Sequence, residues 1–222
     1  MDIAILGGTG DIGEGLALRL AAGTNHDVCI GSRDATKAET KADGYTTELD
    51  SRGIDSEVLG FENAAAAERA DVVVLAVPPY HVGDTVEAVA GVLDDGDILV
   101  SPATGMKRDE DGFHYHKPGA GSVARIAAGA APEGVAVVGA FHNLAAGRLA
   151  NLDADLGIDT LVVGDNEDAK GIVADIAEGV PGLRALDAGS LANAAEIEAL
   201  TPLLINIGSN NEGLHDLGVR FK

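Results

Sequence analysis

Tryptophan is absent from this sequence, and cysteine occurs once, at Cys29. A single cysteine excludes an intramolecular disulfide, and its place in the apolar run DVCIG (27–31) indicates a buried strand residue. No stretch approaches the roughly 18 uninterrupted apolar residues of a membrane span. The first apolar residues follow no basic segment, as those of a secretion signal would. We therefore expect a cytoplasmic protein that has no membrane partner.

Positive charge is scarce. The chain has 15 lysines and arginines against 36 aspartates and glutamates, a formal net charge of −21. This charge disfavours nucleic acids and anionic membranes as partners. A hydrophobic content of 46% indicates a folded chain whose surface carries the charge. In molar salt the Debye length falls to about 3 Å, which screens self-repulsion, so the composition favours a halophilic protein, with an ordinary acidic protein as the alternative.

Short β-branched runs alternate along the chain with longer alanine-rich segments. This alternation predicts an α/β fold with a doubly wound parallel sheet. The run DVVVLAV is fully apolar, which is typical of a central parallel strand covered on both faces. We expect strands at 2–6, 27–31, 56–60, 71–77, 97–101, 134–141, 159–164 and 183–187, and helices at 11–22, 34–51, 62–69, 81–93, 121–130, 166–178 and 191–211.

Two segments interrupt this pattern. Residues 102–119 read as an irregular loop, and a loop of that length in a compact domain usually has a function. Pro202 falls inside the last expected helix, so we expect a kink or a break there.

Glycine is concentrated just after the first expected strand, in LGGTGDIGEG (6–15). Gly8, Gly10 and Gly13 satisfy the G-x-G-x-x-G pattern, between a strand and a helix. In that context the glycines permit a tight turn, close approach of a pyrophosphate and close packing of helix on strand. The alternative is a structural turn without a ligand. The pattern predicts a dinucleotide-binding Rossmann domain over 1–154, followed by a smaller C-terminal α/β part over 155–222.

The end of the second expected strand indicates which dinucleotide binds. An NAD site places a carboxylate about 20 residues after the glycines, but Ser32 and Arg33 stand there and Lys37 follows on the same helical face. A hydroxyl and two cations suit a 2′-phosphate, which favours NADP. A solvated helix end is the alternative, and Asp34 is expected to cap that helix.

Short-chain dehydrogenases share the letters GGTGDIG but need a tyrosine with a lysine four positions later. The residues four positions after Tyr45, Tyr80 and Tyr115 are leucine, aspartate and glycine, which excludes that class.

Over essentially its whole length the chain resembles the archaeal family of oxidoreductases that act on reduced coenzyme F-420 and NADP. Beyond the two cofactor segments, the resemblance depends on VPPYH (77–81), VSPATG (100–105), FHNLAAGRLANLD (141–153), LDAGSLANA (186–194), LTPLLINI (200–207) and LHDLGVRF (214–221).

The resemblance implies direct hydride transfer between the nicotinamide of NADP and the deazaflavin F-420. Two planar rings must then stack about 3–3.5 Å apart with water excluded, and little is required of side chains. No acid–base residue and no metal site is expected. The NADP residues that the resemblance implies are Thr9, Gly10, Asp11, Ile12, Ser32, Arg33, Lys37, Val77, His81, Thr104, Ala146 and Leu217. The deazaflavin is expected near His142 to Ala146 and the C-terminal part.

Several other residues have two interpretations. His142 is either a polar contact to a coenzyme or a structural histidine, and His81 is either a ring neighbour or an early helix residue. His114 and His116 have no partner cluster and indicate an exposed loop rather than a metal site. Lys107 and Arg108 form a hypothetical receptor for the anionic tail of F-420.

The rival functions are another NADPH-dependent reductase, acting on an imine, a carbonyl or ferric iron, and a sensor that binds NADP without turnover. The partners we expect are small-molecule coenzymes and further copies of the chain. The apolar segment LTPLLINIG (200–208) is either a surface of a homodimer or higher oligomer, or a buried core helix.

Overall fold

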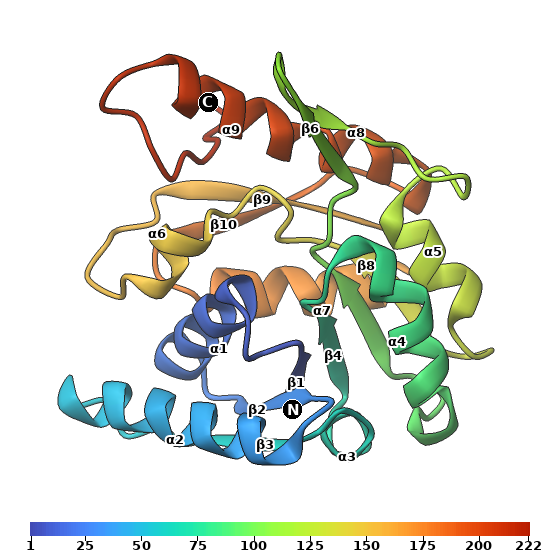
Figure 1. Ribbon diagram of the computed structural model, residues 1–222. Coiled ribbons are helices and arrows are strands. Elements are labelled where there is room, and N and C mark those ends of the chain that lie inside the picture. The colour runs from blue at the N-terminus through green and yellow to red at the C-terminus, as the bar shows by residue number, and fades with distance from the viewer.

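The structure, a computed structural model, describes residues 1–222 and is built around one eight-stranded sheet (Figure 1). The strand order is β10-β9-β8-β5-β4-β1-β2-β3, and all neighbours are parallel except β8 and β9. The chain order reverses between β1 and β4, which confirms the doubly wound sheet. The strands are β1 (Asp2–Leu6), β2 (Asp27–Ser32), β3 (Val58–Glu62), β4 (Val72–Leu75), β5 (Ile98–Ser101), β8 (Ala136–Gly139), β9 (Ile158–Gly164) and β10 (Leu183–Asp187).

Helices cover both faces of the sheet, so successive strand residues enter two separate cores. In β1, Ile3 and Ile5 belong to one core, and Ala4 and Leu6 to the other. The first core is closed by α1 (Asp11–Gly23), α2 (Ala35–Ser51), α6 (Ala146–Ala150) and α7 (Glu167–Glu178). The second is closed by α3 (Asn63–Ala67), α4 (Val82–Val89), α5 (Val123–Ala130) and α8 (Ala194–Glu198). Burial on both sides explains the continuous apolar runs of the central strands.

The stretch 102–119, expected to be irregular, contains a hairpin of β6 (Met106–Asp109) and β7 (Gly112–Tyr115). Its residues are too polar and its strands too short to predict from alternation. A distant side chain stabilises it: Asn206 Nδ2 donates to the Phe113 carbonyl at 2.7 Å, and the Phe113 N–H donates to Asn206 Oδ1 at 2.8 Å.

The expected C-terminal helix is divided into a 3₁₀ turn (Leu191–Asn193), α8 and α9 (Leu200–Asn210). The break lies at Ala199 and Pro202 falls in the first turn of α9, where the missing N–H of proline costs nothing, so the predicted interruption is confirmed. The expected helix 81–93 is likewise shortened to α4, with the 3₁₀ turns Pro79–His81 and Ala90–Val92 at its ends, and the strand expected at 56–60 begins two residues later.

Residues after α9 return to the sheet, where Val219 forms a bridge with Asp159 of β9. Figure 1 shows α9 and the C-terminal segment on one side of β9, and α1 and α2 on the other. The predicted boundary at residues 154 and 155 falls in the connection between β8 and β9, and it stays a prediction. None of the helices has the length and hydropathy needed to cross a membrane.

Candidate functional site: a cleft at the carboxyl edge of the sheet

The glycine loop joins β1 to α1 and leaves the start of that helix bare. Gly10 is the N-cap residue and offers no side chain, so the first N–H groups of α1 have no protein acceptor at the cap. A Cβ atom at Gly8 would lie 2.5 Å from Ile30 Cβ, and one at Gly13 would lie 2.5 Å from the Gly7 carbonyl oxygen. Strand and helix therefore pack at glycine-only distances, and the free N–H groups and the helix dipole face an open edge that suits a phosphate.

Tyr45 stabilises this loop by a hydrogen bond, a role that the sequence did not reveal. Its hydroxyl donates to the Gly8 carbonyl oxygen at 2.9 Å and lies 3.2 Å from Glu14 Oε2, which also pairs with Lys41 at 3.1 Å. Burial and the neighbouring Glu14 carboxylate raise the pKa of Tyr45. The hydroxyl therefore stays protonated and remains a donor to the loop.

Ser32 ends β2 beside the glycine loop, since the Gly7 N–H donates to the Gly31 carbonyl at 3.0 Å. Arg33 and Lys37 are exposed, and neither has a carboxylate within 4.0 Å. Asp34 caps α2 as expected, by accepting from the Lys37 N–H at 3.2 Å. In a protein with 36 acidic residues, two cations without a carboxylate partner at this place are available to an anionic ligand.

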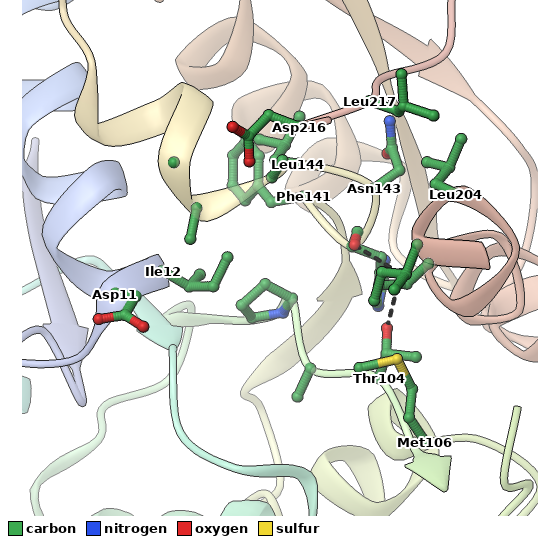
Figure 2. A pocket seen from close by; sticks show the side chains of 18 of the residues that line it. Asp11, Ile12, Thr104, Met106, Phe141, Asn143, Leu144, Leu204, Asp216 and Leu217 are labelled. Atoms are coloured by element: carbon green, nitrogen blue, oxygen red, sulfur yellow. Dashed lines mark hydrogen bonds between the residues drawn. The ribbon is translucent and has the colours of Figure 1, made fainter. Parts of the chain in front are cut away.

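A cavity of about 840 Å³ extends from the start of α1 to α9. Figure 2 shows Asp11 and Ile12 on one side of it, Leu204 and Leu217 on the other, and Thr104 below. The carboxyl ends of β4, β5 and β8 form its floor, the edge where open α/β sheets hold ligands. Among the expected residues, the cavity brings together Gly10, Asp11, Ile12, Val77, Thr104, His142, Ala146 and Leu217.

The remaining expected residues lie outside the cavity lining. Thr9 belongs to the adjoining glycine loop, Ser32 ends β2 and Arg33 directly follows it, and Lys37 belongs to the first turn of α2. His81 ends the turn after β4, and its ring lies 4.5 Å, centroid to centroid, from that of Tyr80.

His142 lies after β8 in the cavity wall and is only 3% exposed. Neither ring nitrogen has a hydrogen-bond partner in the protein, although its carbonyl oxygen accepts from Thr201 Oγ1 at 2.7 Å. Burial lowers the pKa of His142 to about 4. At neutral pH the imidazole is therefore uncharged, and its one donor and one acceptor are buried behind the cavity wall without a protein partner.

The backbone around His142 is held in an unusual conformation. Phe141 has a φ of 66°, a left-handed value that costs a residue with a Cβ of order 1–3 kcal/mol. The Phe141 N–H donates to Thr160 Oγ1 at 2.9 Å, and Asn143 Nδ2 donates to the Asp159 carbonyl at 2.7 Å. Buried polar residues of β9 thus stabilise the loop 141–143, which forms part of the cavity wall.

Asn143 lies within the range 142–146 that was expected to meet the deazaflavin, and it lines the cavity. Lining residues that the sequence did not indicate include Phe141, Thr201 and Leu204. Thr201 and Leu204 enter the cavity only because α9 folds back over it, and no local pattern shows this.

The β6–β7 hairpin forms the rim next to this cavity, which Met106 lines. Lys107 and Arg108 follow Met106 and are exposed, and the Arg108 guanidinium lies 5.2 Å from the centre of the Phe113 ring. His114 pairs with Asp109 at 2.9 Å on the same hairpin.

Three comparisons relate the chain to known proteins. The family model "NADP oxidoreductase coenzyme F-420-dependent" matches residues 2–105. The F-420-dependent NADP reductase of Methanocaldococcus jannaschii is 42% identical over 213 residues, which cover 93% of this chain and 92% of that protein. Its counterpart from Methanothermobacter marburgensis is 39% identical over 100% of this chain and 98% of its own. A crystal structure from an Arthrobacter species, 23% identical, superposes with a TM-score of 0.80 and covers 100% and 99% of the two chains, which shows the same fold.

Proposed function

The chain belongs to the family of F-420-dependent NADP reductases and transfers a hydride between F-420 and NADP, and we propose that it does so in the cleft at the carboxyl edge of its sheet. One observation carries this assignment of the site: a single cavity joins the bare N-terminus of α1 to an apolar chamber under α9. A dinucleotide bound at the first end points its far ring into the second.

The residues present fit NADP. The glycines at positions 8 and 13 leave a cradle that a Cβ would fill, and the free N–H groups of α1 suit a pyrophosphate. We assign the loop Thr9–Ile12 to the pyrophosphate, and Ser32, Arg33 and Lys37 to the 2′-phosphate. The absence of a competing carboxylate near Arg33 and Lys37 supports this assignment.

When both coenzymes are bound, each supplies one ring and a hydride passes directly between them. We assign the nicotinamide to a position bounded by Val77, Thr104 and Ala146, with Leu217 on the opposite wall and His81 outside the lining, in the turn after β4. The aliphatic walls exclude water, which hydride transfer requires. His142 stays neutral because burial depresses its pKa, so it adds no charge beside the rings.

The deazaflavin then occupies the chamber between His142–Ala146 and α9. Its anionic tail leaves past the β6–β7 hairpin, where Lys107 and Arg108 are exposed. Reversing both charges should raise the KM for F-420 and leave that for NADP unchanged. The control, Arg52→Glu with Arg69→Glu, changes net charge equally at a distance; an equal effect on both coenzymes would contradict the role.

To test the function, the purified protein is mixed in molar salt with reduced F-420 and NADP, and the absorbance of oxidised F-420 is followed. NAD replaces NADP in a parallel experiment. Reappearance of the absorbance of oxidised F-420 with NADP, and little with NAD, is the expected result. Equal rates with NAD would support the oxidoreductase activity but contradict the 2′-phosphate site. Binding of NADP without any return of absorbance would favour the sensor instead.

We further propose a homodimer or higher homo-oligomer that works in the cytoplasm. On α9 only Pro202 is buried, while Leu203 is 52% and Ile207 37% exposed. These side chains suit a contact between copies, and Leu203→Glu should shift sedimentation in molar salt towards the monomer. We retain 1–154 as the NADP-binding domain and 155–222 as the part that completes the deazaflavin chamber.

A further inference from the structure

Asp159 is a carboxylate with a fully buried side chain, and the hydride transfer described above makes no direct use of it. Its oxygens accept from Arg184 Nε at 2.9 Å, from Arg184 Nη2 at 2.7 Å and from the Phe221 N–H at 2.7 Å, and Arg220 Nε lies 3.7 Å away. The Arg184 guanidinium holds the pKa of the Asp159 carboxyl below its ordinary value. An ion pair between the buried Asp159 carboxylate and the partly exposed Arg184 guanidinium, with the bond to the Phe221 N–H, therefore holds the C-terminus on β9.

The backbone of Asp159 makes two further links. Its N–H donates to the Val219 carbonyl at 2.7 Å, and its carbonyl accepts from Asn143 Nδ2 at 2.7 Å. Asn143 belongs to the cavity wall after β8, and Leu217 belongs to the wall made by the C-terminal segment; both lie on the same side of the cavity in Figure 2. One residue of β9 thus supports both of these wall segments.

The second wall segment has few other supports. We call residues 212–218 the C-terminal strap; it contains no helix or strand, and Leu214 to Leu217 line the cavity. Its backbone hydrogen bonds lie at its two ends. At the first end the Leu214 N–H donates to the Asn211 carbonyl oxygen, and beyond the second end Val219 and Phe221 bond to Asp159. A Cβ at Gly218 would lie 3.0 Å from Ile158 Cβ, so the strap approaches β9 as closely as glycine permits.

We propose that Asp159 is a positioning residue: together with Arg184 it latches the C-terminal strap to β9 and so fixes the position of both wall segments on that side of the cavity, against which the coenzyme rings stack. The inference rests on the proposed site. Hydride transfer requires rings about 3–3.5 Å apart, and a displacement of about 1 Å can slow such a reaction about 100-fold.

The test compares Asp159→Asn, Arg184→Gln, the double variant and the control Asp187→Asn. The control breaks a different ion pair, between the buried Lys170 and Asp187 at 3.0 Å. Asp187 lies on β10, three residues after Arg184, and does not contact the strap. Hydrogen exchange of peptides covering 141–144 and 212–222 reports on the walls. Single-turnover hydride transfer reports on ring positioning, and the Kd of NADP reports on the glycine loop.

In Asp159→Asn we expect faster exchange in both wall peptides, a single-turnover rate reduced at least about tenfold and a Kd for NADP changed less than about threefold. Arg184→Gln should be more severe than the double variant, because it leaves a buried charge without its partner. The control should show neither the faster exchange nor the slower hydride transfer.

Unchanged exchange in 212–222 would overturn the latch. Faster exchange with a single-turnover rate equal to that of the control would overturn the positioning role. If the wild-type protein transferred no hydride, the proposed function would fail, and the exchange data would still decide whether Asp159 holds the two wall segments.

Discussion

Thr201 connects α9 to His142 across the cleft: its hydroxyl donates to the His142 carbonyl oxygen at 2.7 Å. Because its proton is used there, Thr201 Oγ1 accepts from Thr104 Oγ1, 3.2 Å away. Three segments, the ends of β5 and β8 and the first turn of α9, are therefore held together by two hydroxyl groups at the edge of the proposed ring site.

Replacing Thr201 by valine keeps the shape of the side chain and removes both bonds. A neutral hydrogen bond is worth about 1 kcal/mol, so we expect kcat to fall about fivefold, with a higher KM for F-420 than for the wild type. Thr40→Val is the control, since Thr40 bonds only to Thr36 on the exposed face of α2. Steady-state kinetics with unchanged kcat and KM in Thr201→Val would contradict the link.

The choice of NADP over NAD should depend on Arg33 and Lys37. Bonds to a charged group contribute about 1.5–3 kcal/mol each, so Arg33→Ala with Lys37→Ala should raise the KM for NADP about 100-fold or more and leave the KM for NAD unchanged. Arg52→Ala, which removes a cation beyond the far end of α2, should change neither. Equal losses for NADP and NAD would show that these cations do not contact the 2′-phosphate.

The glycine loop offers a matched pair of substitutions. Gly13→Ala places a Cβ 2.5 Å from the Gly7 carbonyl oxygen, whereas Gly44→Ala, inside α2, meets nothing within 4 Å. Gly13→Ala should weaken NADP binding at least about tenfold and destabilise the fold, because the Gly7 backbone cannot move away from the added Cβ at low cost. Gly44→Ala should stabilise it by about 0.5–1 kcal/mol. Calorimetric titration with NADP and chemical unfolding measure both, and two equal effects would contradict the close packing.

The sheet and the glycine loop could be predicted because their signals are local. An apolar run followed by glycines specifies β1, the loop and α1 within 23 residues, and Ser32–Arg33 directly follows the second run. The far half of the cleft has no such signal. Thr201 meets His142 across 59 residues of chain, and the hairpin at 106–115 is held by Asn206. Such contacts depend on how α9 folds back, which periodicity does not encode.

Two buried titratable groups, Glu198 and His142, should make the free energy of unfolding depend on pH in opposite directions. Glu198 is fully buried, accepting from the N–H groups of Val123 and Ala124 at 2.7 and 3.1 Å and from the Tyr115 hydroxyl at 2.9 Å. Burial nevertheless raises the pKa of Glu198 from 4.5 to about 7. Burial lowers the pKa of His142 from 6.5 to about 4.

The raised pKa of Glu198 means that the folded state holds a proton that the unfolded state has lost between pH 4.5 and about 7. Its contribution to the free energy of unfolding is complete below pH 4.5 and is lost as the pH rises through about 7. For His142 the unfolded state binds the extra proton, so its contribution is complete above pH 6.5 and is lost as the pH falls through about 4. In the wild type the two slopes largely cancel over the shared range.

Single variants should separate the two slopes. Glu198→Gln keeps an oxygen for the two N–H groups and cannot ionise, so its free energy of unfolding relative to the wild type should increase by up to about 3 kcal/mol from pH 4.5 to 7.5, since one pKa unit is worth about 1.4 kcal/mol. His142→Phe should gain a similar amount relative to the wild type as the pH falls from 6.5 to 4. Urea unfolding in constant molar salt measures both differences, in which the common titration of the surface carboxylates cancels. Differences independent of pH would show that neither burial perturbs a pKa, whereas a slope in only one variant would assign the perturbation to that residue alone.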